Sequence, residues 1–349
     1  MLTIILLTFN RPAFLERTLA HLTQTRCANR ILVADASKDD VAVVNQGIVA
    51  GAGTLDAHYL RVTAGAHVYV AYWTALNLAD TEFVVMLADD DFLVPAGLAD
   101  ACAFLSRHPD YGVAVGRSFM IRRPLPQLAH LASAVITELA MCDRSFIQPT
   151  AEGRVADVIG SRYRFSAPKT VYGVMRRSEA IALYGRALAA GLSNSNTERL
   201  INMLVLVAGR IKLVDCTYSI REYHTANSAA QAHVLTVPTV TDYATFVPGG
   251  SLTGLGPKER CDRILADLLA EVDGLGRAAS AAVIDRWNAA CAIWVDGSTS
   301  RSGAHATASS RGRVARGLAV MTNVVREAAS TVVLCATDRE LRIVYAAFR

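Results

Sequence analysis

The chain of 349 residues is long enough for one large domain with an appendage, but short for three domains. Apolar residues make up 52% and charged residues 19%, which excludes disordered and collagen-like proteins. The net charge of +4 is uneven, because residues 1–100 carry 6 Lys/Arg and 11 Asp/Glu whereas residues 101–245 carry 16 and 10. The acidic part suits a metal ion and the basic part an acidic partner, although chance on a solvated surface explains the asymmetry about equally well.

Cysteine usage and hydropathy bear on the compartment. The seven cysteines are odd in number, widely spread and without a C-x-x-C pair, which favours reduced, buried thiols in a cytosolic protein. No run reaches the roughly 18 apolar residues of a membrane-spanning helix. The opening Met1–Leu7 lacks a basic region and is typical of a buried strand rather than a signal peptide. We expect a cytoplasmic protein, with peripheral contact at the inner membrane face left open.

Short apolar runs alternate with helix-like segments up to about residue 116, which predicts β-α-β units and a mostly parallel sheet. Four strands are expected, at Thr3–Thr8, Arg30–Asp35, His58–Val62 and Glu82–Ala88. We expect Asn10 to cap a first helix that has Pro12 in its first turn, and a second helix over Val70–Ala79.

The later sequence is mixed and then helical. Between the first sheet region and residue 246, the pattern predicts a strand at Thr170–Met175, a helix from Ser178, a helix at Glu198–Ala208 and a strand at Ile211–Val214. Beyond Pro248 only helices are expected, at Lys258–Asp273, Ala278–Val295 and Val314–Ala336, with a Ser/Gly-rich link at 297–312 before the last.

Three adjacent carboxylates, Asp89, Asp90 and Asp91, follow the most apolar strand. Ligands of open α/β sheets bind beyond the carboxyl ends of strands, so these carboxylates should face a crevice. Adjacent carboxylates repel one another, and a divalent cation bound with substrate phosphates would offset that repulsion. The alternative is that the run only caps the turn or helix at Pro95.

The ordered segments Leu6–Pro12, Val33–Ser37 and Ala79–Asp91 resemble the nucleotide-binding half of family-2-type glycosyltransferases, and the resemblance covers about the first 225 residues. It implies the GT-A fold, a nucleotide-sugar donor and a D-x-D-like metal motif. The same resemblance implies that the nucleotide contacts Thr8, Phe9, Arg11, Asp35 and Gly65. Each of these residues also has an ordinary interpretation as a strand end, helix cap or turn residue.

The resemblance is not complete. Counting back from Pro95, Ala88 stands where the first Asp of D-x-D usually lies. Asp90 is therefore the first choice of metal ligand and Asp91 the second. Asp89 is expected beside the donor. Where such enzymes often show Ala-Arg-Asn before the acidic strand, this chain has Ala71-Tyr72-Trp73. The implied cofactor is Mn²⁺ or Mg²⁺.

The later part of the resemblance points to Glu198 as catalytic base, since an inverting transfer needs one carboxylate on the acceptor side. The alternative is a capping box formed by Ser195 and Glu198. The resemblance further implies Arg221 as a partner of the leaving diphosphate and His224 as a metal ligand. The basic pairs Arg122-Arg123, Arg162/Arg164 and Arg176-Arg177 suit an acidic acceptor or a solvated face.

Together these features predict an α/β GT-A core with a helical C-terminal extension, divided into a nucleotide-sugar half (1–116), an acceptor half (117–246) and the extension (247–349). The predicted reaction is metal-dependent, inverting transfer of a sugar, with UDP as the expected nucleotide, to a saccharide, lipid-linked or small-molecule hydroxyl. The alternatives are a sugar-phosphate nucleotidyltransferase and a catalytically degenerate binding subunit. Nucleic acid is not an expected partner, whereas a homodimer that covers Ile264–Leu269 and Val320–Val325 is.

Overall fold

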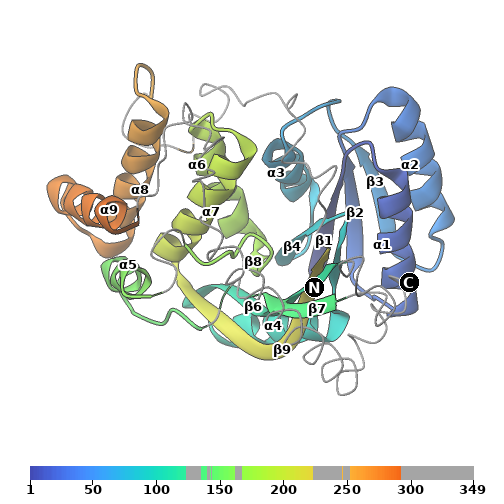
Figure 1. The fold of residues 1–349 in the computed structure, drawn as a ribbon, viewed down its shortest axis with the longest axis horizontal. Helices are drawn as coiled ribbons and strands as arrows, with labels where there is room; N and C mark the ends of the chain where they lie inside the picture. Colours follow the sequence, from blue (N-terminus) through green and yellow to red (C-terminus); the bar gives the residue numbers. More distant parts are fainter. Residues whose placement is uncertain are drawn as a thin grey trace, which may run out of the picture.

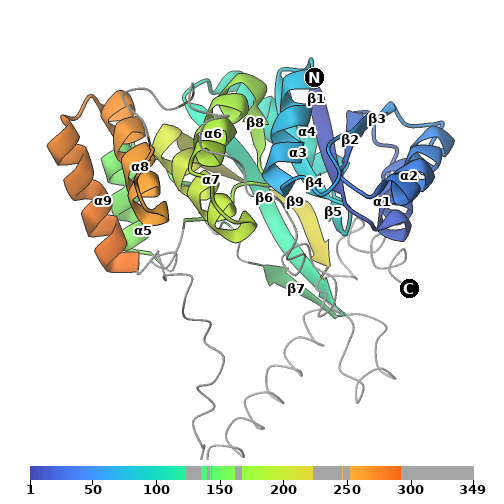
Figure 2. The ribbon, with the colours of Figure 1, turned by 90° about the horizontal axis from the view of Figure 1, so that it is seen from above.

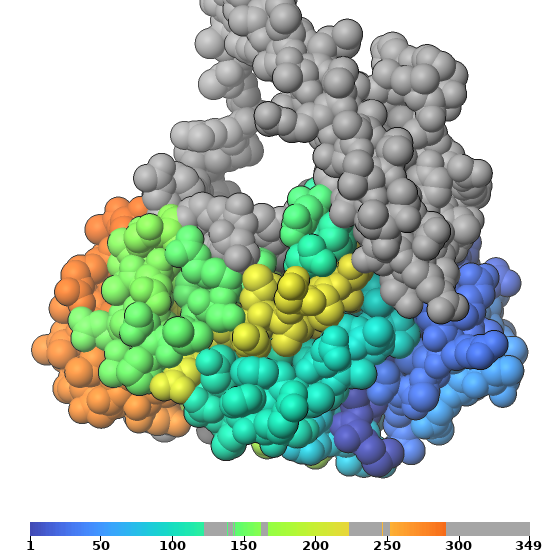
Figure 3. Space-filling view, turned by 90° about the horizontal axis from the view of Figure 1, so that it is seen from below, coloured from blue at the N-terminus to red at the C-terminus, as the bar shows by residue number. Residues whose placement is uncertain are grey.

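The computed structural model describes residues 1–122, 135–139, 142, 144–161, 167–222, 246 and 252–291. Within these ranges, one mixed sheet of nine strands runs through the molecule in the order β3-β2-β1-β4-β8-β6-β9-β5, with β7 beside β6. Figure 1 shows the N-terminal units at one end and the C-terminal helices at the other, with the sheet between them. The space-filling view in Figure 3 shows the same order on one face of the molecule, from blue to orange.

The N-terminal units form the parallel part of the sheet. Its elements are β1 (Leu2–Thr8), α1 (Pro12–Gln24), β2 (Arg30–Asp35), α2 (Asp39–Gly51), β3 (Ala57–Arg61), α3 (Val68–Leu78) and β4 (Phe83–Ala88). Strand β1 pairs in parallel with β2 and β4, and β2 with β3. Right-handed crossovers place α1 and α2 on one face, whereas the return from β3 to β4 places α3 on the other. The four strands expected from apolar runs are confirmed, and every residue of β1 is buried.

The second part of the sheet departs further from the sequence pattern. Its elements are β5 (Asp91–Leu93), α4 (Pro95–Arg107), β6 (Tyr111–Arg122), β7 (Val135–Leu139), α5 (Ala151–Ile159), β8 (Val174–Arg176), α6 (Arg177–Ala189), α7 (Asn194–Ala208) and β9 (Arg210–Glu222). The strand expected at 170–175 begins later, and β9 is far longer than the expected 211–214. Buried polar residues interrupt the apolar pattern of β9. Ser219, for example, is buried, and its hydroxyl forms a hydrogen bond with that of Ser118 in β6, with 2.8 Å between the oxygens.

Two predicted caps are wrong. Asn10 has φ 56° and does not cap α1, whose N-cap is Arg11. Instead, the side-chain oxygen of Asn10 accepts a hydrogen bond from the backbone N–H of Lys38 at 2.9 Å, which joins the loops after β1 and β2. Helix α7 begins two residues earlier than the alternative capping box requires, because its N-cap is Ser193 and Ser195 already lies inside the helix. The side chain of Glu198 is therefore available for another role.

The helical extension is confirmed over its described part, which consists of α8 (Pro257–Asp273) and α9 (Arg277–Cys291). These helices pack on α5, α6 and α7 at the end of the molecule remote from β1 (Figure 2). The carboxylate of Asp273 accepts hydrogen bonds from the backbone N–H groups of Ala151 and Glu152, at 2.8 and 2.9 Å, where α5 begins. The fold thus uses the end of α8 to cap the start of α5.

Burial of the extension bears on the expected dimer. Ile264, Leu265 and Leu269 are each at most 1% exposed within the single chain, so this stretch needs no second copy to cover it. The stretch 320–325, the expected helix at 314–336 and the link at 297–312 lie outside the described residues. No helix in the described ranges is long and apolar enough to cross a bilayer.

Candidate active site

Strand register assembles the floor of the site. Thr8, the last residue of β1, pairs with Asp35 of β2, and Leu7 pairs with Ala88 of β4. The carboxyl ends of three parallel strands therefore meet at one edge of the sheet, which is where open α/β sheets bind ligands. Asp89, Asp90 and Asp91 follow directly, so chain order alone carries them to the same edge.

A pocket of about 220 Å³ lies at this edge. Its walls come from β1, β2, β4, the start of α3, the start of α7 and β9. Of the residues predicted to form the site, those that line it are Thr8, Phe9, Arg11, Asp90, Glu198 and Arg221. Ala88, which replaces the first Asp of D-x-D, lines it too. The volume is below the about 300–1,000 Å³ of typical small-molecule sites, so the described walls enclose only part of a ligand as large as a nucleotide sugar.

Asp89 is buried behind the pocket wall rather than facing it. Its carboxylate accepts a hydrogen bond from the hydroxyl of Thr8 at 2.7 Å and forms an ion pair with the guanidinium of Arg11. Burial raises the pKa of Asp89 to about 7, and the charge of Arg11 opposes this shift. Arg11 also donates to the carboxylate of Asp90 at 2.8 Å. The guanidinium of Arg11 thus offsets the repulsion between these two carboxylates.

Asp91 is likewise buried, and its partner comes from the opposite wall. It opens β5, which pairs antiparallel with β9 so that Asp91 lies opposite Arg221. Its carboxylate accepts hydrogen bonds from Arg221 Nε at 3.0 Å and from the backbone N–H of Glu222 at 3.2 Å. Burial raises the pKa of Asp91 to about 6, against the opposing charge of Arg221. Asp91 therefore anchors Arg221 at the pocket.

Asp90 is the member of the acidic run that faces the pocket, with its side chain 15% exposed. Within the part of the chain that the structure describes, no three His, Cys, Asp or Glu side chains converge as a metal cluster. Of the three adjacent aspartates, Asp90 lines the pocket, whereas Asp89 and Asp91 are buried. One carboxylate still fits a divalent cation of the Mg²⁺ type, which takes most of its ligands from phosphate and water oxygens.

Two predicted nucleotide contacts lie outside the pocket lining. The carboxylate of Asp35 is fully buried and accepts hydrogen bonds from the backbone N–H of Ser37, the amide of Asn45 and the hydroxyl of Tyr59, at 2.7, 3.0 and 2.9 Å. It stabilises the loop after β2, while its neighbours Ala34 and Ala36 line the pocket.

Gly65 has φ 71°, a left-handed conformation that favours glycine, and its N–H donates to the carbonyl of Ala36. It therefore shapes a loop beside the site, where the adjacent Ala66 is the residue that lines the pocket. His224, the predicted additional metal ligand, lies outside the described residues.

Glu198 lies on the first turns of α7, with its side chain 29% exposed. Its Oε2 accepts a hydrogen bond from the hydroxyl of Tyr69 at 3.1 Å, and its Oε1 lies 3.6 Å from Nζ of Lys169. A carboxylate on a rigid helix, partly open to a pocket, is suited to accept a proton.

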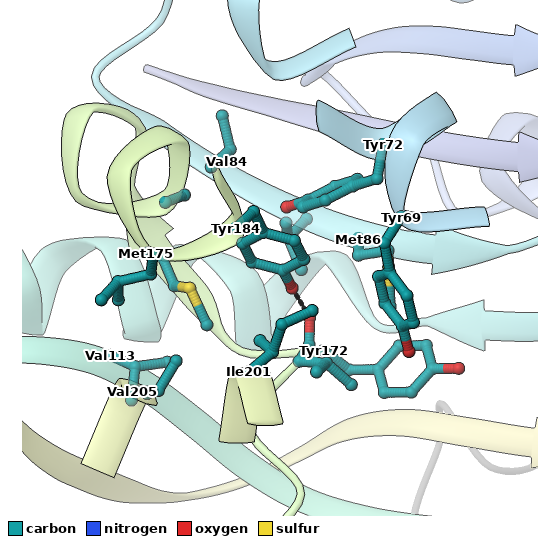
Figure 4. Close-up of a cluster of buried hydrophobic side chains, with 14 of the residues drawn as sticks. Tyr69, Tyr72, Val84, Met86, Val113, Tyr172, Met175, Tyr184, Ile201 and Val205 are labelled. Atoms are coloured by element: carbon teal, nitrogen blue, oxygen red, sulfur yellow. Dashed lines mark hydrogen bonds between the residues drawn. The ribbon is translucent and has the colours of Figure 1, made fainter. Parts of the chain in front are cut away.

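Two tyrosines of the pocket were not identified from the sequence. Tyr69 and Tyr172 line it, and the Tyr172 hydroxyl accepts a hydrogen bond from Arg221 at 3.0 Å. Figure 4 shows Tyr69 and Tyr72 projecting from α3 towards Tyr172 and Tyr184. Tyrosines at helical spacing in an apolar segment are ordinarily core residues, so the pattern around Tyr69 held no signal that separated a pocket residue from a core residue.

For the basic pair Arg176-Arg177, the sequence left an acidic acceptor or a solvated face open, and the structure shows contacts within the protein. Arg176 donates to the backbone carbonyls of Tyr111 and Leu105, and Arg177 donates to the carbonyl of Leu76. Both guanidinium groups therefore brace the sheet and its helices rather than face an acidic acceptor. Arg123, Arg162 and Arg164, and the side chain of Arg122, lie outside the described part of the chain.

Comparison with known proteins finds a family match for the N-terminal part of the chain. Residues 3–131 match the family described as Glycosyl transferase family 2, whereas no protein with a curated description matches the sequence.

Similar solved structures include S. aureus TarS 1-349 in complex with UDP-GlcNAc, which is 16% identical, covers 83% of this chain and 90% of its own, and has a TM-score of 0.45. The mannosyltransferase PcManGT from Pyrobaculum calidifontis, in complex with GDP-Man and Mn²⁺, is 15% identical, covers 97% of this chain and 87% of its own, and has a TM-score of 0.43. The matched range includes the parts of β1, β2, β4 and α3 that line the strand-end pocket. The match of residues 3–131 to glycosyl transferase family 2 supports a glycosyltransferase.

Proposed function

We propose that this enzyme transfers a sugar, with inversion, from a nucleoside diphosphate sugar to an acceptor hydroxyl, and that the nucleotide is UDP. The observation that carries the proposal is that a single strand-end pocket brings together Asp90, Arg221 and Glu198 from three separate elements. An arginine fork matches the oxygens of a diphosphate. A carboxylate on another wall can accept the proton that the acceptor hydroxyl loses during transfer.

A divalent cation, Mn²⁺ or Mg²⁺, is part of the proposal. Asp90 would hold it, and the remaining ligands would be diphosphate oxygens and water. Such a cation supplies Lewis-acid stabilisation of the charge that builds on the leaving diphosphate. Arg11 now pairs with Asp90 and lines the same pocket. Its positive charge is therefore available on the donor side as well.

Glu198 is proposed as the general base. As the acceptor oxygen attacks the anomeric carbon, its proton passes to the Glu198 carboxylate and the bond from that carbon to the diphosphate oxygen breaks on the opposite face. The hydroxyl of Tyr69 donates to the carboxylate beside the pocket, and Nζ of Lys169 lies 3.6 Å from its other oxygen. One carboxylate placed in this way supports a single displacement and hence inversion.

Asp90→Asn tests the metal assignment. The substitution keeps the size of the side chain and removes its charge, so we expect UDP affinity in the presence of Mn²⁺ to fall by at least about tenfold, towards the affinity measured with EDTA. Titration calorimetry with UDP, with and without Mn²⁺, measures the difference. Asp56→Asn is the matched control, since Asp56 is 52% exposed and pairs with Arg30. Equal UDP affinity in Asp90→Asn and the parent would remove the metal from the proposal.

The donor itself is tested by incubating the parent with a set of UDP- and GDP-sugars and Mn²⁺ and measuring release of the nucleoside diphosphate, with water as the fallback acceptor. Release from UDP-sugars supports the proposed donor. Binding of UDP without release from any sugar would instead support a catalytically degenerate binding protein.

A further inference from the structure

The carboxylate of Glu198 is held by a side chain from the other half of the enzyme. Tyr69 and Glu198 are 129 positions apart in the sequence, and the hydroxyl of Tyr69 donates to Oε2 of Glu198 at 3.1 Å. Lys169, the other neighbour, is 3.6 Å from Oε1, beyond normal hydrogen-bond distance, and is itself 52% exposed. The Tyr69 contact is therefore the one that fixes the orientation of the carboxylate.

Tyr69 is itself rigidly placed. It is 3% exposed and lies in the first turn of α3, where its backbone N–H donates to Nδ1 of His67 at 3.3 Å. Its ring contacts that of Tyr184 with 6.1 Å between the centroids. One turn later, the indole N–H of Trp73 donates to the carbonyl of Ile181, which ties α3 to α6. A buried ring on a braced helix gives the hydroxyl a fixed position, whereas a glutamate side chain is flexible.

The same helix start forms part of the donor side of the pocket. Ala66, Val68 and Ala71 line the pocket together with Tyr69, beside the carboxyl ends of β1 and β2. A donor bound at these strand ends would therefore contact the segment that carries Tyr69. The geometry connects the donor wall to the proposed base through a single hydrogen bond.

We propose that Tyr69 is a positioning residue for transfer, which fixes Oε2 of Glu198 and leaves Oε1 directed to the hydroxyl of the acceptor. This inference rests on the proposed role of Glu198 as base. Tyr69 does not exchange a proton in the reaction. Its contribution is to keep the accepting oxygen in the reactive geometry, where small displacements lower rates strongly.

Tyr69→Phe tests the inference because it removes only the hydroxyl and keeps the buried ring. Loss of one hydrogen bond to a charged group should lower kcat about tenfold or more, with the KM for the donor and the Kd for UDP unchanged. A role confined to folding would not separate kcat from donor affinity in this way. Tyr72→Phe is the matched control: Tyr72 lies on the same helix, is 1% exposed and packs on Tyr184 at 4.7 Å, but does not line the pocket. We expect this control to keep the parent kcat.

A double-mutant cycle with Glu198→Gln completes the test. If Tyr69 acts through the carboxylate, Tyr69→Phe should lower the rate of the parent but have little further effect in the Glu198→Gln background. An equal fall in both backgrounds, or a Tyr69→Phe kcat equal to that of the parent, overturns the positioning role. If Glu198→Gln itself keeps the parent rate, the proposed base is wrong and the role of Tyr69 falls with it. A loss in Glu198→Gln beside an unchanged Tyr69→Phe rejects the inference alone.

Discussion

Both walls of the pocket pair an arginine with aspartate side chains, but different elements of the fold bring the partners together. On the N-terminal wall, Arg11 pairs with Asp89 and Asp90, and all three residues lie next to the ends of the parallel strands β1 and β4. On the C-terminal wall, Arg221 crosses from β9 to Asp91, 130 positions away in the sequence, while Glu198 meets Tyr69 from α3.

The difference separates two kinds of information. The N-terminal wall follows from strand register, because parallel strands in register bring their carboxyl ends together. The C-terminal wall depends on the antiparallel pairing of β5 with β9 and on where α7 begins. The proposed roles predict that variants of Arg11 and Asp90 on the first wall mainly change donor binding or stability, and that variants of Glu198 on the second wall mainly change turnover.

Glu198→Gln should give the largest effect and tests the C-terminal wall. Gln keeps the shape and can retain a contact with Tyr69, but it cannot take the acceptor proton. Turnover at saturating donor and acceptor should fall by about 10² to 10⁴, with UDP affinity unchanged in calorimetry. Because Glu198 is not part of a cap, the melting temperature should change little.

The matched control for this experiment is Glu271→Gln. Glu271 is 54% exposed and pairs with Arg186 far from the pocket, so its transfer rate should equal that of the parent. A Glu198→Gln rate within a few-fold of the parent would rule out a base at this position.

Arg11→Gln should give the next largest effect and tests the N-terminal wall. It leaves the buried carboxylate of Asp89 without its ion-pair partner, and breaking a buried pair from one side costs about 3 kcal/mol of the free energy of unfolding. Urea unfolding measures the loss. Arg30→Gln is the comparison, because Arg30 forms exposed pairs with Asp56 and Asp80 whose loss should cost much less of the free energy of unfolding. Equal costs for the two variants would contradict the distinction between buried and exposed pairs.

Asp273→Ala should give the smallest effect and lies outside both walls. It removes two hydrogen bonds from the start of α5, which predicts a loss of about 1 kcal/mol in the free energy of unfolding. Turnover and UDP affinity at a temperature well below melting should stay at parent values. A specific loss of turnover would show that the extension contributes to the site, contrary to the division of the two walls.

The sequence was most informative where local pattern determines structure. The strands before Asp35 and Asp89 are short apolar runs, and their order predicted both the sheet and the edge that carries the pocket. Local pattern failed where partners are distant. Three adjacent aspartates indicate a joint metal site. In the structure, however, the carboxylate of Asp89 pairs with Arg11 and that of Asp91 pairs with Arg221. These partners are distant in the sequence and are brought close only by the fold.

The same limit explains the errors at α7 and β9. Ser195 and Glu198 have the spacing of a capping box, but the helix begins before Ser195, so the spacing carries no cap. Strand β9 contains polar residues such as Ser219 that are satisfied by a neighbouring strand, and an apolar-run criterion passes over them. Tyr69 resembles a core residue because it is 3% exposed, yet it also lines the pocket and its hydroxyl contacts Glu198.

The continuity of the apolar core into α8 and α9 has a consequence for engineering. Trp287 of α9 and Leu269 of α8 are fully buried in the same cluster as the strands of the sheet. A shortened enzyme that ended before α8 would expose a large apolar face on α5 and α7 to water, a surface prone to aggregation. A minimal fragment should therefore extend at least to residue 291, and a chimaera that exchanges the extension must exchange the facing residues of α5 and α7 as well.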